Sequence, residues 1–222
     1  MPDYLEIGSF HIPSKWVMIV VTLIISFLII KRMTSNQQHS KVVLDDVSNS
    51  LIIGFIVWKF SYILFQFHYA FSYPISILYF DGGSKGILLA FLIFYLFLFY
   101  RSKKTLIPLS FYTQISFQLF LVGSIIFHFI HILNNPLYFS IQITFAFIIF
   151  LLVWKNKDER IGEIQRYLLV YSFGQFFLQF YSPLQPFLLG FTVVHFICAS
   201  IILWSVFHQL EGGYYEKKHN HY

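Results

Sequence analysis

The sequence predicts an all-α integral membrane protein with about seven transmembrane helices, an N-terminus outside the cell and a C-terminus in the cytoplasm. Only 11% of the 222 residues are charged, whereas 57% are hydrophobic. A chain with so little polar surface suits a bilayer better than water. The hydrophobic residues also gather in long runs, and lysine and arginine are concentrated in alternate connections between those runs.

The hydrophobic runs define the predicted spans. About 20 residues of helix are needed to cross roughly 30 Å of hydrocarbon. Seven runs approach this length, at about 13–31, 49–68, 84–100, 110–131, 136–154, 166–183 and 186–208. The third is short unless residues 77–80 contribute, and the last two are separated only by Ser182, Pro183 and Pro186. We expect one polytopic domain, residues 1–210, followed by a polar cytoplasmic tail, residues 211–222.

The charged connections indicate the direction of the spans. Basic residues follow the first, third and fifth runs and also occupy the tail: Lys31, Arg32, Lys41, Arg101, Lys103, Lys104, Lys155, Lys157, Arg160, Arg166, Lys217 and Lys218. The alternate connections hold only Lys15 and Lys85. By the positive-inside rule the basic connections are cytoplasmic. The net charge of +5 is therefore interpreted as a topology signal, and no nucleic-acid partner is expected.

Lys59 lies near the middle of the second predicted span, in the stretch WKFSYILF. Every acidic residue falls in a predicted loop or terminus, so we expect no carboxylate at the depth of Lys59. An ionisable group inside the membrane suggests a function, and a lipid phosphate could supply the missing anion. The alternative is a lysine that snorkels, or loses its proton, beside backbone carbonyls.

Two histidines lie at the outer end of the fourth predicted span. His128 and His131 are three residues apart and so share a helix face, as do pairs that bind metals or transfer protons. His195 lies in the seventh span, but spacing assigns no third ligand, and Cys198 is the single cysteine. We therefore expect no metal site and no cofactor. Histidines that face lipid headgroups are the alternative interpretation.

Two glutamines form a polar stripe on the sixth predicted span. Gln175 and Gln179 are four residues apart on an otherwise aromatic helix. Hydrogen bonding between helices is the simplest interpretation. A shared buried polar network would add three further glutamines: Gln114, Gln118 and Gln142.

Five stretches of the chain stand out together, in this order: IGSFHIPSKWVMIVVTLIISFLIIKR, VSNSLIIGFIVWKFSYILFQF, YPISILYFDGG, NNPLYFSIQ and YSFGQFFLQFYSP. In this order they resemble stretches of the bacterial prolipoprotein diacylglyceryl transferase family. In the second stretch Lys59 falls at the place of a family arginine and Tyr62 at that of a tyrosine. The third sets Asp81, Gly82 and Gly83 on the family's Asp/Glu-Gly-Gly connection.

Members of that family move diacylglyceryl from phosphatidylglycerol to the lipobox cysteine of a preprolipoprotein. The resemblance implies a multi-pass protein of the bacterial plasma membrane. Its partners would be a phosphatidylglycerol-like phospholipid and a lipoprotein or another membrane protein. It also implies these lipid- or substrate-binding positions: Lys59, Tyr62, Asp81, Gly82, Gly83, Gln175 and Gln179.

The chain departs from the family where the family carries its chemistry. IIFHFIHIL stands where the family has Arg-x-Gly-Asn-Phe-x-Asn-x-Glu, so that Ile125 replaces the arginine and His128 falls near the asparagine. Ile87 lies near the place of the family histidine. Gln175 and Gln179 replace an arginine and a glutamate. The external head domain is cut to about five residues. Because cations would stabilise the departing phosphate, standard transfer is not expected.

Three functions follow from these observations. The first is a divergent relative that binds phospholipid or a lipidated substrate without the standard chemistry. The second is an active lipid- or lipoprotein-modifying transferase with a remodelled site, in which His128 or His131 is the general base and Lys59, Gln175 and Gln179 stabilise charge. The third is a pathway for a small solute or anion, with Lys59 as the anion site.

Overall fold

The computed structural model describes residues 4–7, 10–35, 37, 39–155, 161–183 and 186–219. The described chain is helical except for one short antiparallel hairpin near its start, formed by β1 (Tyr4–Ile7) and β2 (Phe10–Pro13). The helices are α1 (Ser14–Met33), α2 (Ser40–Phe65), α3 (Phe67–Ser72), α4 (Ser76–Tyr79), α5 (Gly83–Thr105), α6 (Leu109–Ile130), α7 (Pro136–Lys155), α8 (Ile161–Leu178), the 3₁₀ helix η1 (Gln179–Tyr181) and α9 (Val193–His219). The predicted helical fold class is confirmed.

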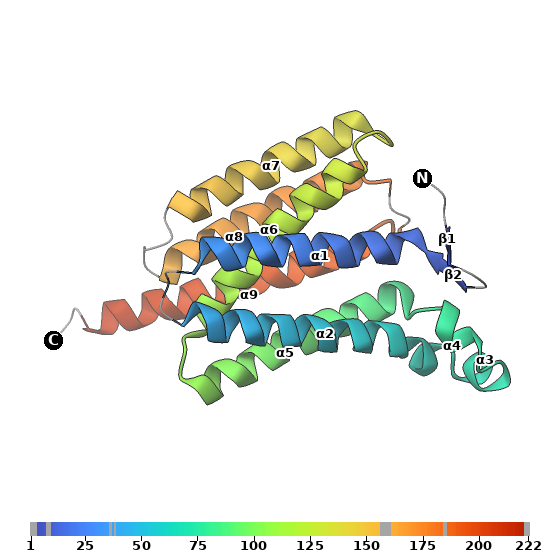
Figure 1. The fold of residues 1–222 in the computed structure, drawn as a ribbon. Helices are drawn as coiled ribbons and strands as arrows, with labels where there is room; N and C mark the ends of the chain where they lie inside the picture. Colours follow the sequence, from blue (N-terminus) through green and yellow to red (C-terminus); the bar gives the residue numbers. More distant parts are fainter. Residues whose placement is uncertain are drawn as a thin grey trace.

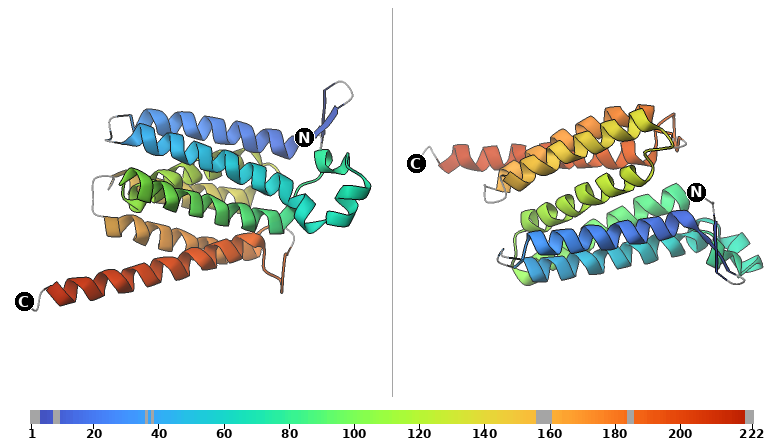
Figure 2. Two further views of the ribbon diagram at one scale, coloured as in Figure 1. Left: turned by 90° about the horizontal axis from the view of Figure 1, so that it is seen from below. Right: turned by 45° about the horizontal axis from the view of Figure 1, so that its top comes forward.

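The long helices run alternately in opposite directions. Figure 1 shows this alternation for α1, α2, α5, α6, α7, α8 and α9, with the two termini at opposite ends of the bundle. α6 lies between α1, α2 and α5 on one side and α7, α8 and α9 on the other (Figure 2). The helix pairs with the most extensive packing are α2 with α5, α6 with α7, α8 with α9, and α1 with α6.

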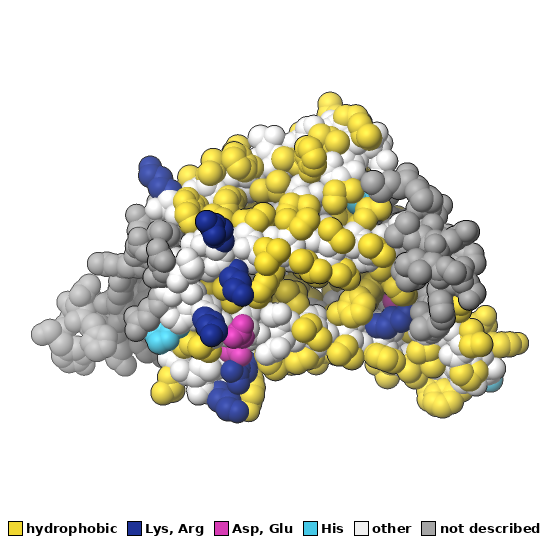
Figure 3. Space-filling model, viewed as in Figure 1, with side chains coloured by type: hydrophobic (Ala, Val, Ile, Leu, Met, Phe, Trp, Pro, Cys, Tyr) yellow, Lys and Arg dark blue, Asp and Glu magenta, His cyan; other side chains and the backbone are white. Residues whose placement is uncertain are grey.

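Five of the described helices are long and apolar enough to cross a membrane: α1 from Trp16, α2, α5, α6 and α7. In α9 the described apolar part, Val193–Val206, is shorter. Large hydrophobic side chains are exposed along the long helices, among them Leu28, Ile52 and Leu92. Figure 3 shows hydrophobic side chains spread over the bundle face. Such a surface fits lipid contact better than contact with water.

Two buried clusters hold the bundle together, and α6 contributes to both. Ile30, Val47, Leu98 and Ile115 belong to a cluster between α1, α2, α5 and α6. The second cluster lies between α6, α7 and α8: Phe117, Leu121, Ala146, Ile149, Val153, Ile164, Leu168 and Tyr171. The central position of α6 follows from this, because its opposite faces are both buried.

The helices that contain the second and the seventh predicted spans have other bounds than those spans. α2 begins at Ser40, nine residues before the predicted start. The last helix begins at Val193 rather than at 186, because Pro183, Pro186 and a left-handed Gly190 (φ 82°) break the chain. It also continues to His219, well into the predicted polar tail, where lysine and glutamate are good helix formers. Residues 220–222 lie outside the described part.

The early start of α2 also corrects the prediction that all acidic residues lie outside helices. Asp45 and Asp46 both lie in α2. Asp46 is only 3% exposed, and its Oδ1 lies 2.7 Å from Nη2 of Arg101 at the end of α5. The Tyr112 hydroxyl of α6 donates to its other oxygen at 2.7 Å. A buried carboxylate is tolerated inside α2 because two other helices neutralise and hydrogen-bond it.

Exposed basic side chains gather at one end of the bundle, where α1, α5 and α7 end and α2, α6 and α8 begin (Figure 3). They are Lys31, Arg32, Lys41, Lys103, Lys104, Lys155 and Arg166, here called the basic end. At the opposite end the lysine and arginine side chains that the structure describes are Lys59 and Lys85. The connections that are rich in lysine and arginine therefore lie together at the basic end, and the connections with few basic residues lie at the opposite end.

Candidate functional site

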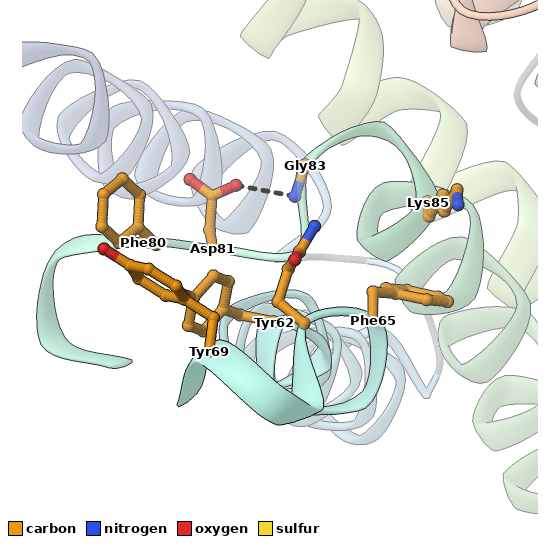
Figure 4. Close-up of a pocket in the computed structure, with 9 residues that line it drawn as sticks. Tyr62, Phe65, Tyr69, Phe80, Asp81, Gly83 and Lys85 are labelled. Atoms are coloured by element: carbon orange, nitrogen blue, oxygen red, sulfur yellow. Dashed lines mark hydrogen bonds between the residues drawn. The ribbon is translucent and has the colours of Figure 1, made fainter. Parts of the chain in front are cut away.

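A pocket of about 470 Å³ lies at the end of the bundle opposite the basic end. It lies between the end of α2, α3 and the connection that leads into α5 (Figure 4). Its lining residues are Tyr62, Phe65, Gln66, Tyr69, Phe80, Asp81, Gly82, Gly83 and Lys85. Four of them, Tyr62, Asp81, Gly82 and Gly83, are sequence-predicted site residues.

The two glycines let the connection pack directly on α2. The Gly82 amide donates to the Trp58 carbonyl at 3.0 Å, and a Cβ at Gly82 would collide with the Ser61 hydroxyl. Gly83 has a left-handed backbone (φ 55°), and its amide donates to Asp81 Oδ1 at 2.8 Å (Figure 4). The Asp-Gly-Gly stretch is therefore explained by close approach and by a left-handed turn at the start of α5.

Aromatic rings form the apolar wall of the pocket. α2 ends at Phe65 because Gln66 leaves the helical region (φ −126°, ψ 41°), and the chain then turns into α3, which carries Tyr69. The buried Tyr62 ring stacks on Phe80 at 5.6 Å between centroids. The Tyr62 hydroxyl donates to the Ser76 hydroxyl at 3.2 Å. The predicted residue Tyr62 thus ties α2 to the connection and to α4.

Lys59 lies behind this wall and is not among the residues that line the pocket. Because α2 ends at Phe65, Lys59 is about 9 Å from the end of the helix, not at its middle. Its ammonium donates to the Phe80 carbonyl at 2.8 Å and lies 4.0 Å from the Trp16 ring centroid. Lys59 therefore joins α1, α2 and the connection.

The expectation that no carboxylate lies at the depth of Lys59 is also wrong. The connection folds back along α2, and Asp81 comes close enough to interact electrostatically with the ammonium. The sequence suggested a lipid phosphate as the partner anion of Lys59. It did not reveal that Asp81 of the neighbouring connection lies near the ammonium.

Among the pocket residues that were not predicted from the sequence, Lys85 is the charged one. It is exposed in the first turn of α5, with its ammonium 5.7 Å from the Phe65 ring centroid. Figure 4 shows Lys85 and Phe65 on one side of the pocket, with Asp81 and Phe80 on the other. From the sequence, Lys85 was interpreted only as a charge that indicates the direction of the spans. The available sign of its place in the pocket was its position two residues after Gly83, at the start of the same helix.

The two predicted histidines lie elsewhere, where α6 meets α7. His131 follows the last residue of α6, and its Nδ1 lies 2.8 Å from the Phe127 carbonyl. His128 packs against Phe139 of α7, with ring centroids 5.6 Å apart, and its Nδ1 has no hydrogen-bond partner among the described residues. Neither lines the pocket. Within the described ranges no three His, Cys, Asp or Glu side chains group as metal ligands.

The glutamine stripe forms hydrogen bonds from α8 and η1 to α7, as its simplest interpretation predicted. Gln175 Nε2 donates to Gln142 Oε1 at 2.6 Å and to the Tyr171 hydroxyl at 3.1 Å. The Tyr138 hydroxyl accepts from Gln142 Nε2 at 3.0 Å and from Gln179 Nε2 at 3.3 Å. All five side chains are buried. This network is internal to the bundle and does not reach the pocket lining.

Two further residues named from the sequence, His195 and Gln118, are buried and lie outside the glutamine network. His195 is buried at the start of α9, where its Nδ1 lies 3.0 Å from the Thr192 amide, which donates to it. The Phe180 ring covers it at 4.7 Å between centroids. Gln118 is buried in α6, and its amide has no partner in the described part of the chain, so it does not join Gln142.

The predicted site residues thus lie in three separate places: the pocket with Lys59 behind it, the histidine pair, and the glutamine network. The pocket combines an aromatic wall with one ammonium and one carboxylate. This chemistry suits an amphipathic ligand with a polar head. Neither predicted general base is beside it.

Comparison of the chain with protein-family models finds no matching family. A sequence search among curated proteins also finds no match. The resemblance to the diacylglyceryl transferases therefore stays a prediction.

Proposed function

We propose that this chain is a multi-pass protein of the bacterial plasma membrane that binds a phosphatidylglycerol-like phospholipid in the pocket between α2, α3 and α5. It would be a divergent relative of the prolipoprotein diacylglyceryl transferases that does not carry out standard transfer. The pocket itself carries the proposal, because its lining pairs four aromatic rings with Lys85 and Asp81.

The proposed topology has seven crossings, with the basic end in the cytoplasm. Five helices meet the length and hydropathy expected of spans. α8 has 18 residues, about 27 Å of helix, and α9 returns antiparallel to it. The gathering of exposed lysine and arginine at one end supports this orientation. The pocket then lies at the outer side of the membrane.

The mixed charge of the pocket favours a particular headgroup. The Lys85 ammonium suits a phosphate, whereas Asp81 would repel a bare phosphate but accept hydrogen bonds from hydroxyl groups. Phosphatidylglycerol offers both a phosphate and a glycerol diol. The rings of Tyr69 and Phe80 offer apolar contact to the rest of the lipid.

The separation of the candidate groups favours binding over transfer. A general base must come within hydrogen-bond reach of the proton that it removes. His128 and His131 lie against α7, and Gln175 and Gln179 are already engaged in the α7–α8 network. None of the four lines the pocket.

Native mass spectrometry of the purified protein tests this function. We expect phosphatidylglycerol to be retained in preference to phosphatidic acid, which lacks the diol. Lys85→Gln should weaken retention about tenfold, because it removes one charge-assisted contact of about 1.4 kcal/mol. Lys103→Gln is the matched control, since Lys103 is equally an exposed lysine near a phenylalanine ring (5.5 Å, Phe99), but at the basic end.

Equal loss of lipid in the two lysine variants, or no retained phospholipid in the wild type, would contradict the proposal. A complementary assay separates binding from enzymatic activity. Expression in a strain depleted of its own diacylglyceryl transferase should give no rescue of growth. Rescue that is lost in His128→Ala would instead establish an active enzyme.

A further inference from the structure

The segment between α2 and α5 is apolar although it lies outside both long helices. Residues 66–80 contain no Asp, Glu, Lys or Arg. Figure 1 and Figure 2 show α3 and α4 projecting at the end of the bundle opposite the C-terminus. The large side chains of α3, α4 and the residues beside these helices are exposed: Phe67, Tyr69, Phe71, Tyr73, Ile75, Tyr79 and Phe80 are all 44% or more exposed. Water is a poor match for such a surface.

Helix length places this segment at a membrane boundary. The Asp46–Arg101 ion pair marks the basic end of the apolar part of α2. From Asp46, about 30 Å of hydrocarbon corresponds to about 20 residues of helix, because each residue rises about 1.5 Å. Twenty residues on is Gln66, where α2 stops and α3 begins. α3 therefore starts where the hydrocarbon ends.

The composition of α3 and α4 fits the layer just beyond the hydrocarbon. Tyr69, Tyr73 and Tyr79 combine an apolar ring with a hydroxyl, and such side chains concentrate at the boundary between acyl chains and headgroups. The rings also pair along α3, with Phe67 and Phe71 at 4.4 Å and Tyr69 and Tyr73 at 5.1 Å between centroids. The segment presents several exposed aromatic rings.

We infer that α3 and α4 form an interfacial anchor that lies in the headgroup region of the outer leaflet, beside the phospholipid pocket. The leaflet assignment rests on the orientation in the proposed function. Tyr69 connects the anchor to the pocket, because it lines the pocket and is itself 49% exposed. The pocket is thereby held at the level where phospholipid headgroups lie.

Depth measurement with a single fluorescent label tests this anchor. Cys198 is the only cysteine and is buried, so Cys198→Ser gives a cysteine-free protein, with Cys198→Ala as the substitute if it fails to fold. An NBD label is attached at Phe71→Cys in α3. Leu92→Cys, exposed near the middle of α5, is the deep control, and Lys103→Cys at the basic end is the control for the cytoplasmic side.

In proteoliposomes the label at position 71 should be quenched at least twofold more by phosphatidylcholine with a doxyl group at acyl carbon 5 than at carbon 12. Position 92 should show the reverse order. Quenching of position 71 by aqueous iodide alone, or a depth equal to that of position 92, would overturn the interfacial location.

The leaflet is tested separately in spheroplasts, with the carbon-5 doxyl lipid added from outside. Quenching at position 71 but not at 103 is expected. Quenching at 103 instead would overturn the leaflet assignment and the proposed orientation, while leaving the depth result intact. Lipid retention by mass spectrometry does not depend on either label, so failure of the anchor and failure of phospholipid binding are distinguishable.

Discussion

The ion pair between Asp46 and Arg101 predicts the largest effect of any single polar substitution at the basic end. Asp46 is 3% exposed, and both of its carboxylate oxygens are engaged, one by Arg101 and one by the Tyr112 hydroxyl. Asp46→Asn keeps the size of the side chain but removes its charge. Arg101 of α5 would then lose its partner, and the contact between α2, α5 and α6 would weaken.

The expected magnitude follows from burial. Breaking a fully buried ion pair costs about 3–5 kcal/mol. The Arg101 side chain is 26% exposed, so part of its charge can turn to water and the cost falls to about 2 kcal/mol. For a chain of this size that corresponds to a fall in melting temperature of about 4–8 °C. Tyr112→Phe, which removes one hydrogen bond, should cost about 1 kcal/mol.

Thermal unfolding of the detergent-solubilised protein, followed by size-exclusion fluorescence, measures these shifts. Asp45→Asn is the matched control, because Asp45 is the adjacent carboxylate in α2 but is exposed. It should change the melting temperature by less than about 2 °C. A double variant, Asp46→Asn with Arg101→Gln, should lose less than the sum of the two single changes. Equal shifts for Asp45→Asn and Asp46→Asn, or strict additivity in the double variant, would refute the reasoning.

The remaining predictions concern the pocket and the interior network. Gly82→Ala should destabilise the protein by about 1–3 kcal/mol, because the added methyl group meets Ser61. Gly82→Ala combined with Ser61→Gly should recover part of the loss in a melting assay, because the contact with the Gly86 Cα at 3.0 Å remains and a glycine inside α2 has its own cost. Gln175→Leu should cost about 1 kcal/mol by leaving Gln142 Oε1 without its donor, and an unchanged melting temperature would contradict the network. Lys59→Gln should speed amide exchange at residues 80–83, because the connection loses one of its ties to α2, whereas Lys59→Arg should preserve much of the protection. Equal exchange in both variants would count against that role.

The helical fold was predictable because composition and run length are properties of the sequence alone. The failures lie where distant residues meet. α2 was predicted to begin too late because Asp45 and Asp46 looked like loop residues, and only the fold brings Arg101 and Tyr112 to Asp46. For the same reason Lys59 was predicted near the middle of its helix, whereas it lies near the end.

The candidate site was predictable where it depends on neighbouring residues, and not where it depends on contacts between distant ones. Asp81, Gly82 and Gly83 form one local turn, so a short stretch of sequence carried the information. Lys85 was missed because its role depends on the return of the connection to α2. The glutamine network was anticipated from helical spacing, but its separation from the pocket depends on how α7 and α8 pack.

The position of bound lipid tests the proposed function most directly. Phosphatidylglycerol that carries a photoactivatable diazirine in its acyl chain would be crosslinked to the protein in proteoliposomes, and the labelled residues identified by peptide mass spectrometry. Specific labelling, removed by an excess of unlabelled phosphatidylglycerol and reduced by Lys85→Gln, should map to residues 62–85. Specific labelling confined to the basic end, around Lys31 and Lys103, would contradict a phospholipid site in the pocket.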